Sequence, residues 1–360
     1  MHVKKAFIRN FRNITEETIE LSNKINILYG QNAQGKTNFL EALYLCAMGR
    51  SMRTNIESEM IRFENSQADI KLIFDNSEKI DVHLFTNRKK IIDVNSVQIN
   101  KLGELFGKFL TVIFSPEDLQ LVKTNPSVRR KFMDTELCQI NKIYYYELKQ
   151  YYRILRQRNN SLKKIRENKL PKQILDVWDE QLIKCGINII NQRYEFIEKI
   201  DNHAQKIYFY VTGGTESLKT FYKPNANVQD FESKLKKRRD YDILIGSTSA
   251  GIHKDDLSFE INNMSAKIFG SQGQQKSVAL SLKLAEIYLI HEITNKFPVL
   301  LLDDILSELD ESRQFFLLDA IKNFQVILTC TGIENAIKKN IHTANFFKVE
   351  SGKFFSENGV

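Results

Sequence analysis

The sequence predicts an α/β fold in which a long helical segment interrupts one mixed domain. Three observations lead to this expectation. Short apolar runs with strand-like alternation fill residues 1–115, and helical spacing with few turn residues dominates residues 116–242. Strand and helix patterns alternate again over residues 243–360, as expected of a sheet with helices packed against it. We therefore expect the two outer segments to form one domain and the middle segment to be a helical domain inserted into it.

In the first segment, alternating apolar residues predict strands at residues 4–8, 69–74, 79–85 and 110–114. Asn, Gly and Ser residues separate these runs, as is typical of turns between strands. A further run at residues 25–29 is apolar throughout, which predicts a fully buried strand.

The buried strand leads directly into the pattern G-x-x-x-x-G-K-T, and a helical pattern follows at residues 37–48. This order of strand, loop and helix favours a phosphate-binding loop over a simple glycine turn. In such a loop the backbone N–H groups and the helix N-terminus cradle phosphate, the Lys36 ammonium reaches the β- and γ-oxygens, and the Thr37 hydroxyl ligates Mg²⁺. The candidate nucleotide-binding residues are Gly30, Gln31, Asn32, Ala33, Gln34, Gly35, Lys36 and Thr37.

In the middle segment, apolar and aromatic residues recur at three-to-four spacing between residues 126 and 208, which predicts several long helices. One stripe on these helices is more typical of a helix-packing seam than of a ligand site. Its members are Leu148, Tyr151, Tyr152 and Leu155.

The surplus positive charge also lies in the middle segment. Residues 141–240 hold 21 Lys and Arg against 12 Asp and Glu, which leaves 31 against 32 in the rest of the chain. A basic surface interleaved with tyrosines suits a polyanion such as nucleic acid, although a solvated helical face would have the same composition. The candidate DNA-binding residues are Arg153, Arg156, Arg158, Lys163 and Lys164.

The third segment predicts strands at residues 257–261, 298–303 and 325–329, and helices at residues 274–291 and 311–322. The strand at 298–303 is apolar until it ends in Asp303 and Asp304. Beside a phosphate-binding loop, this arrangement favours Asp303 as a magnesium-associated carboxylate over a pair that merely caps a strand end. Asp304 then faces the γ-phosphate and, with Lys36, is a candidate catalytic residue that orients the attacking water.

A second motif begins the helix near residue 274, where Ser271, Gln272, Gly273 and Gln274 offer a hydroxyl and free N–H groups to an anion. Taken alone, the motif is a helix N-cap. Its position about 30 residues before the acidic strand is the order found for the signature motif of ABC-type ATPases. The run that ends at Asp310, shortly after the acidic strand, matches the D-loop of the same class.

The composition is that of a soluble globular protein with 42% hydrophobic residues. No run approaches the length of a membrane span, and the N-terminus lacks a signal-peptide core, so we expect a cytoplasmic protein. The four cysteines are scattered and have no metal-ligand spacing, which indicates reduced core thiols. They are Cys46, Cys138, Cys185 and Cys330.

These motifs together resemble the RecF family, bacterial recombinational-repair proteins related to the heads of SMC ATPases. The resemblance covers essentially the whole chain. Two departures from the family pattern stand in the segment 251–256, where Ile252 and Lys254 replace the usual Pro and Arg. The residues that carry the resemblance are Asn10 to Asn13, Gly30 to Thr37, Ser51 to Thr54, Phe114 to Asp118, Pro126, Arg129 to Asp134, Gly251 to Asp256, Ser271 to Gln275, Asp303 and Asp304.

The resemblance implies an ABC-type P-loop ATPase head with an inserted helical arm, and ATP and Mg²⁺ as cofactors. It implies that ATP is held between two copies of the chain, with Ser271 and Gly273 of one copy capping the γ-phosphate bound by the other. It further implies binding to DNA, double-stranded or gapped, and action with RecR and RecO in loading RecA at gaps. Compared with ABC transporters, Asp304 replaces the usual Glu, and this shorter acid, which must reach through a water, predicts slow hydrolysis. Thr329 lies near the position expected for a switch His.

Other functions fit parts of the sequence. The nucleotide-binding subunit of a membrane transporter would share the loop, but the basic helical insertion suits it poorly. A structural SMC-like tether would need longer arms than about 120 residues allow at 1.5 Å of rise per residue. A kinase would leave the Ser271 motif unexplained.

Overall fold

The computed structural model describes residues 2–332 and 344–357. It divides into two compact units. The head unit consists of Met1–Gln120 and Ala279–Val360, and the arm unit is Leu121–Val278. The sequence-based division placed the second boundary at residue 243. The unit boundary falls later because strand β10 (Asp256–Ile261) pairs with β9 (Leu218–Lys223), which belongs to the arm.

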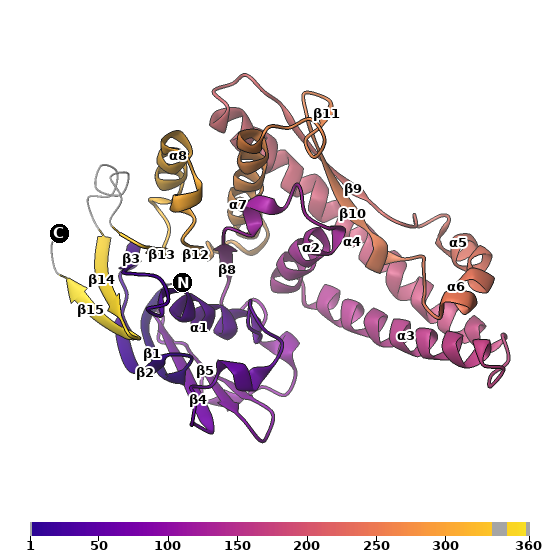
Figure 1. The fold of residues 1–360 in the computed structure, drawn as a ribbon, viewed down its shortest axis with the longest axis horizontal. Coiled ribbons are helices and arrows are strands. Elements are labelled where there is room, and N and C mark those ends of the chain that lie inside the picture. Colours follow the sequence, from indigo (N-terminus) through magenta and orange to yellow (C-terminus); the bar gives the residue numbers. More distant parts are fainter. Residues whose placement is uncertain (1, 333–343, 358–360) are drawn as a thin grey trace. The chain divides into compact units, whose positions relative to one another are not determined.

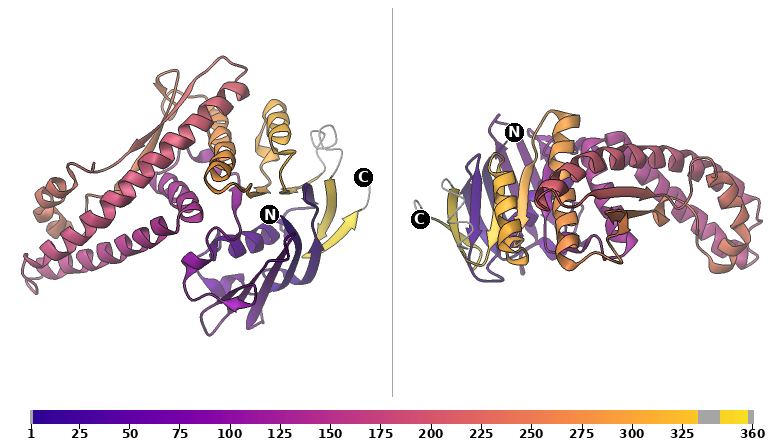
Figure 2. Two further views of the ribbon diagram at one scale, coloured as in Figure 1. Left: turned by 180° about the vertical axis from the view of Figure 1, so that it is seen from behind. Right: turned by 90° about the horizontal axis from the view of Figure 1, so that it is seen from above.

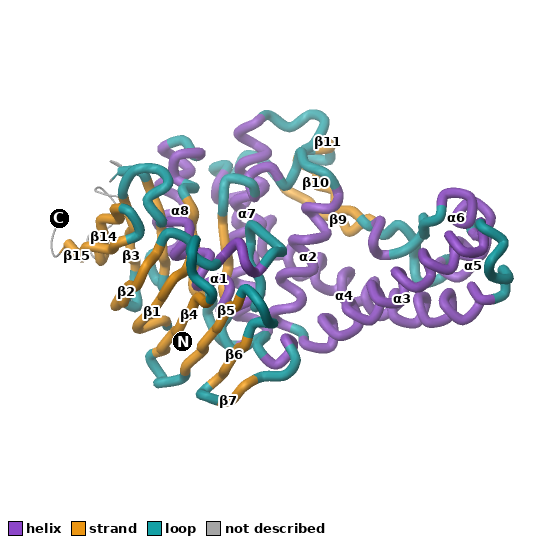
Figure 3. The backbone as a smooth tube through the Cα atoms, turned by 60° about the horizontal axis from the view of Figure 1, so that its bottom comes forward, coloured by secondary structure: helices purple, strands orange, loops and turns teal. Residues whose placement is uncertain are grey.

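The head unit contains two six-stranded sheets. The first sheet is antiparallel, and its strands lie side by side in Figure 3. In spatial order they are β2 (Ile14–Glu20), β1 (Val3–Phe11), β4 (Gln67–Phe74), β5 (Lys79–Phe85), β6 (Ile91–Val94) and β7 (Val97–Gln98).

The second sheet is mostly parallel. In spatial order its strands are β15 (Lys353–Glu357), β14 (Ala344–Glu350), β3 (Ile25–Tyr29), β13 (Val326–Cys330), β12 (Val299–Asp303) and β8 (Thr111–Phe114). Because β3, β13 and β12 run in the same direction, the loop after β3 and the carboxylates that end β12 lie at one edge of this sheet. That edge is where ligands bind in open α/β sheets.

Helix α1 (Lys36–Met48) lies between the two sheets (Figure 1) and contacts strands of both. Almost every side chain of α1 is buried, because a sheet covers the helix on each face. Helix α8 (Glu311–Ile321) packs through Leu317, Leu318 and Ile321. Helix α7 (Gln272–Thr294) begins in the arm unit and ends in the head unit.

The arm unit is built on α2 (Pro126–Ile140) and two long helices, α3 (Lys142–Arg166) and α4 (Ile174–Val211), which run side by side in both views of Figure 2. Asn141 caps α3 by accepting hydrogen bonds from the backbone N–H groups of Ile143 and Tyr144. The expected packing seam is confirmed for three of its four residues, whereas Tyr152 is 38% exposed. A three-stranded sheet of β11 (Met264–Ser265), β10 and β9 and the short helices α5 (Phe231–Lys237) and α6 (Arg239–Ile245) complete the unit.

Short 3₁₀ helices connect the longer elements, namely η1 (Glu57–Met60), η2 (Leu102–Glu104), η3 (Asp118–Gln120), η4 (Ile252–Lys254) and η5 (Leu306–Glu308). The expected helices and strands are present with shifts of a few residues at their ends. Strands β2, β6, β7, β9, β11, β14 and β15 were not expected from the sequence. No helix of the described residues is long and apolar enough to cross a bilayer.

Candidate nucleotide-binding site

The loop between β3 and α1 depends on its two glycines. Gly30 and Gly35 have φ values of 149° and 115°, which other residues rarely adopt. A side chain at Gly30 would collide with the backbone of Val349, and one at Gly35 would lie 2.7 Å from Asn13 Oδ1. The loop can therefore curl tightly only with glycine at these positions.

Lys36 occupies the start of α1 with its ammonium folded back over the loop. Its Nζ donates hydrogen bonds to the carbonyl oxygens of Gly30 and of Gln31, the latter at 2.7 Å. Burial lowers the pKa of Lys36, and the nearby negative charges of Asp304 and Asp303 oppose that effect. The loop thus places a positive charge next to the free N–H groups of a helix N-terminus, an arrangement that suits an anion.

Asp303 connects the loop to the acidic strand. Its Oδ1 accepts a hydrogen bond from the Thr37 hydroxyl at 2.7 Å and one from the Thr329 hydroxyl at 2.9 Å. These hydroxyl and carboxylate oxygens fit Mg²⁺, which prefers oxygen ligands. Among the described residues no group of three or more His, Cys, Asp and Glu side chains could hold a metal ion, so a magnesium ion here would need phosphate oxygens as further ligands.

Asp304 has two unusual properties. Its φ of 48° is in the left-handed region, and within the described residues its buried Oδ1 has no hydrogen-bond partner. Burial raises the pKa of Asp304, the positive charge of Lys36 opposes this, and Asp303 and Glu308 add to it. Backbone strain and an unpaired buried carboxylate oxygen are both features that concentrate at functional sites.

A chain of side-chain hydrogen bonds that ends at the carbonyl of Gln34 in the loop was not expected from the sequence. Arg53 Nη1 donates to Asn38 Oδ1 at 3.0 Å, Asn38 Nδ2 donates to Asn13 Oδ1 at 2.8 Å, and Asn13 Nδ2 donates to Gln34 O at 3.0 Å. Asn13 and Arg53 carry part of the family resemblance, and that was the only signal for them in the sequence.

Glu41, fully buried on α1, connects two further motif residues. It accepts a bidentate hydrogen bond from Arg12, at 2.8 and 2.9 Å, and another from the Ser51 hydroxyl. The motifs that begin at Asn10 and Ser51 therefore converge on the helix that follows the loop.

The Ser271 motif forms a reciprocal capping box at the start of α7. The Ser271 N–H donates to Gln274 Oε1 at 2.8 Å, and the Gln274 N–H donates to Ser271 Oγ at 3.2 Å. Gln274 Nε2 also donates to Glu216 Oε1 at 2.8 Å. Ser271 and Gln272 are exposed, so the hydroxyl and the start of the helix face solvent.

Asp310 caps α8 by accepting hydrogen bonds from the Arg313 N–H and from the Ser312 hydroxyl. Burial acts to raise the pKa of Asp310, but the hydrogen bonds from Ser312 and Arg313 outweigh it and lower the pKa to about 2. Asp310 is therefore a charged helix cap in the position expected for the D-loop.

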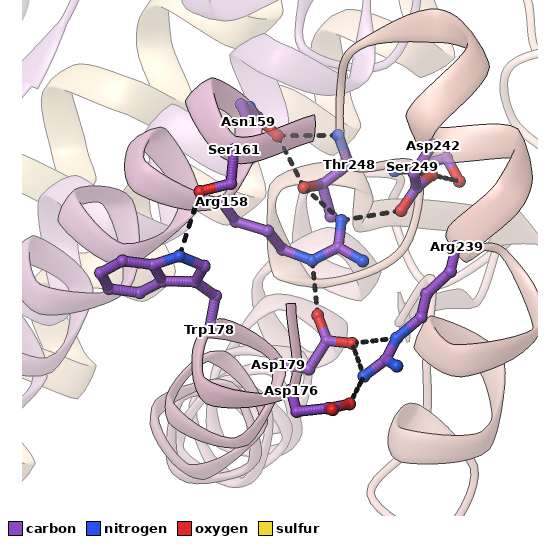
Figure 4. A network of polar contacts seen from close by, with 10 residues as sticks. All are labelled: Arg158, Asn159, Ser161, Asp176, Trp178, Asp179, Arg239, Asp242, Thr248 and Ser249. Carbon is purple, nitrogen blue, oxygen red and sulfur yellow. Dashed lines mark hydrogen bonds and ion pairs between the residues drawn. The ribbon is translucent and has the colours of Figure 1, made fainter. Parts of the chain in front are cut away.

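Four of the five candidate DNA-binding residues are exposed on α3: Arg153, Arg156, Lys163 and Lys164. The prediction for Arg158 is wrong, because its side chain is fully buried. Figure 4 shows its guanidinium between Asp179, at 2.6 Å, and Asp242, at 2.8 Å. Arg158 therefore holds α3, α4 and α6 together and is not available to a phosphate.

The segment 251–256 has a comparable structural role. Asp255 is buried and accepts a hydrogen bond from Arg193 at 2.7 Å, and Asp256 pairs with Arg129. His253 lies between the Tyr151 hydroxyl and the Thr248 carbonyl, each at 2.9 Å. All four cysteines are buried thiols, and none of them forms a disulfide.

Comparison with known proteins gives one consistent result. The model of the RecF/RecN/SMC N-terminal domain family matches residues 2–353. A DNA replication and repair protein RecF from Lachnospira eligens is 45% identical over 363 residues, which cover 99% of this chain and 100% of the relative. The RecF of Clostridium tetani is 44% identical over 366 residues, with 98% and 99% covered.

Solved structures agree. The recombination mediator protein RecF with ATPrS, in the RecFOR pathway, matches with a TM-score of 0.92 and 35% identity over 99% of this chain and 98% of that one. The corresponding structure with ATP matches with a TM-score of 0.91 and 34% identity. An SMC head bound to a domain of ScpA has a TM-score of 0.59 at 16% identity, a likeness of fold alone.

Proposed function

This chain belongs to the RecF family of DNA replication and repair proteins, and from that premise we propose that it is an ATP-dependent DNA-binding protein that dimerises on ATP and hydrolyses it slowly. The family and the ABC-type fold make it an ATP-binding protein. The finer points that follow are inferences from the geometry of its own residues.

One observation carries the nucleotide assignment. The Thr37 hydroxyl of the loop and the Asp303 carboxylate of the acidic strand are in hydrogen-bond contact at 2.7 Å, with Lys36 adjacent. The loop from Gly30 to Thr37 would hold the phosphates through backbone N–H groups and the Lys36 ammonium. Thr37 and Asp303 would hold Mg²⁺, which when bound neutralises charge on the β- and γ-oxygens.

Asp304 is the candidate for orienting the water that attacks the γ-phosphate. Its unpaired buried oxygen is suited to accept a hydrogen bond from that water. An Asp side chain is one methylene shorter than the Glu expected in transporters, so its reach to the water is less direct. We infer slow turnover, which makes hydrolysis a timer for the ATP-bound state; turnover at the rate of a fast transporter ATPase would contradict this.

Ser271 to Gln274 would supply the second half of the site in another copy of the chain. The exposed Ser271 hydroxyl and the N-terminus of α7 suit the γ-phosphate held by the partner's loop. The γ-phosphate would then be the part of the ligand that touches both copies. Its removal would abolish the differential binding that favours the closed dimer.

The exposed basic residues of α3 are the proposed DNA-facing surface, with double-stranded or gapped DNA as the ligand. Lys and Arg neutralise phosphates and release counterions, so this surface needs no base contacts to bind. We also propose, from its membership of the family, that the protein acts with RecR and RecO in loading RecA, in the cytoplasm and at the nucleoid.

Two variants test the composite site. Lys36→Met should abolish binding of ATP, whereas Ser271→Arg should leave ATP binding to the monomer intact and block ATP-dependent dimerisation measured by light scattering. Ser233→Arg, which places the same side chain at another exposed serine near the start of an arm helix, is the control and should dimerise normally. Unchanged dimerisation of Ser271→Arg would contradict the proposal.

A further inference from the structure

The Thr329 hydroxyl contacts both aspartates at the end of β12. Thr329 is fully buried on β13 and lies opposite Asp303 in the parallel pairing of the two strands. Its Oγ1 accepts a hydrogen bond from the Asp304 N–H at 2.9 Å and lies 2.9 Å from Asp303 Oδ1. One side chain therefore contacts both the backbone of Asp304 and the carboxylate of Asp303.

The direction of these hydrogen bonds is determined by the chemistry of the groups. The Asp304 N–H can only donate, so Thr329 Oγ1 accepts from it and has one proton of its own to donate. The two possible acceptors are Asp303 Oδ1 at 2.9 Å and Leu302 O at 3.5 Å. The shorter distance and the negative charge both favour Asp303. The result is a chain from the Asp304 N–H through the hydroxyl to Asp303.

Asp304 needs such support because of its backbone. A left-handed conformation is unfavourable for most residues with a side chain, and it persists where the surroundings hold it. Both polar groups of its peptide are held: the N–H by Thr329, and the carbonyl by the Ser307 hydroxyl at 2.7 Å. The Asp304 Oδ1 itself has no hydrogen-bond partner among the described residues, so the direction of the carboxylate depends on the backbone that carries it and on the Ser307 side chain, which also interacts with it.

We infer that Thr329 is a positioning residue for hydrolysis: its hydroxyl holds Asp304 in the left-handed conformation and thereby directs the Asp304 carboxylate. The inference rests on the proposed function, in which Asp304 orients the attacking water. It assigns a role to the residue near the position where transporters have a switch His. Thr329 acts here through Asp304 and Asp303 and needs no contact with the nucleotide.

The decisive pair of variants is Thr329→Val, which keeps the shape and removes the hydroxyl, and Thr329→Ser, which keeps the hydroxyl. Displacing a catalytic group slightly costs up to about 100-fold in rate, so Thr329→Val should lower kcat for ATP hydrolysis by roughly tenfold or more. Its affinity for a fluorescent ATP analogue should stay within about threefold of wild type, since the loop is untouched, and its ATP-bound dimers should last longer in light scattering. Thr329→Ser should hydrolyse ATP at close to the wild-type rate.

Thr220→Val is the matched control. Thr220 is a buried threonine on β9 of the arm whose hydroxyl has no hydrogen-bond partner among the described residues, so the same change there should leave kcat unaltered. If Thr329→Val fails to fold, Thr329→Ala, which also removes the hydroxyl, takes its place and should also lower kcat.

The outcomes separate this inference from the proposed function. If wild type does not hydrolyse ATP, or if Asp304→Asn hydrolyses it as fast as wild type, the proposed function fails. If Asp304→Asn is inactive but Thr329→Val turns over at the wild-type rate, the positioning role of Thr329 is overturned. An equal loss in Thr329→Ser and Thr329→Val would also overturn it, because packing and not the hydroxyl would then matter.

Discussion

His253 is a residue whose neutral form is built into the arm unit. A carbonyl can only accept, so the imidazole Nε2–H donates to Thr248 O, and Nδ1 is left to accept from the Tyr151 hydroxyl. Burial, with smaller contributions from the charges of Lys254 and Arg130, lowers the pKa of His253 from 6.5 to about 4 against the opposing effects of Thr248 and Asp242. A protonated imidazole at this position would carry a charge away from solvent. Its Nδ1 would also hold a proton and could no longer accept the hydrogen bond from the Tyr151 hydroxyl.

This pKa predicts a specific pH dependence of stability. Between about pH 6.5 and pH 4 the unfolded chain binds a proton at His253 and the folded chain does not, so the free energy of unfolding falls as the pH falls. Full loss, reached below pH 4, amounts to about 3 kcal/mol, from 1.36 kcal/mol for each pKa unit. Urea unfolding of wild type and His253→Gln should differ by a constant amount above pH 7. Below pH 7 the curves of unfolding free energy against pH for the two proteins should converge. Curves that stay parallel down to pH 4 would contradict the assignment.

The helix α3 shows what residue patterns can and cannot predict at the level of an element. The seam from Tyr151 to Leu155 was predictable, because apolar residues at helical spacing mark the buried face. Continuing that spacing places Arg158 on the same face, before the buried residues Leu162 and Ile165. The charge of Arg158 suggested that its side chain lies on the surface. Asp179 and Asp242 neutralise that charge, and because both are far away in the sequence, no local pattern predicts them as partners.

The same contrast applies to the strands. The loop at Gly30 and the strand ending in Asp303 were predictable because fixed chemistry imposes fixed spacing. The pairing of β10 with β9 was not, because β10 has the same alternation whether it joins the head sheet or a small sheet in the arm. Thr329 shows a third case: its role comes from the register between β13 and β12, which the sequence does not encode locally.

The exposed face of α3 leads to a prediction for DNA binding. Replacing Arg153, Arg156, Lys163 and Lys164 by Gln should weaken binding to duplex and gapped DNA. The dependence of log affinity on log salt should become shallower by about 0.9 for each DNA phosphate that the variant no longer neutralises. The measurement is fluorescence anisotropy at several salt concentrations with ATP present. A slope equal to that of wild type would show that DNA binds elsewhere on the molecule.

Arg158 provides the contrasting variant for that experiment. Arg158→Met leaves Asp179 and Asp242 buried with less compensation, which typically costs about 3–5 kcal/mol of folding stability. The quadruple Gln variant changes exposed residues only and should unfold near the wild-type urea midpoint. A salt slope that changed as much in Arg158→Met as in the Gln variant would mean that damage to the folded arm, and not weaker neutralisation of DNA phosphates, explains the effect.

At the scale of the whole molecule, the residues of the proposed site are divided between the two units. The loop and both carboxylates belong to the head unit, whereas Ser271 to Gln274 belong to the arm unit. Lys36→Met and Ser271→Arg therefore damage opposite halves of a site that two copies would share. Each variant alone should hydrolyse almost no ATP, because the Lys36→Met copy does not bind ATP and the Ser271→Arg copy does not form the ATP-bound dimer.

Mixing the two variants should restore activity. In a mixed dimer, the intact loop of the Ser271→Arg copy meets the intact Ser271 of the Lys36→Met copy, so one of the two sites is complete. Because neither variant alone forms an ATP-bound dimer, the dimers in an equimolar mixture are mixed and each has one complete site, which gives at most roughly half of the wild-type number of complete sites. Steady-state phosphate release at a fixed total concentration measures the recovery, and Ser233→Arg mixed with Lys36→Met is the control for the added arginine. A mixture whose rate is only the sum of the separate rates, while ATP still binds to the Ser271→Arg copy, would show that each chain contains its site alone.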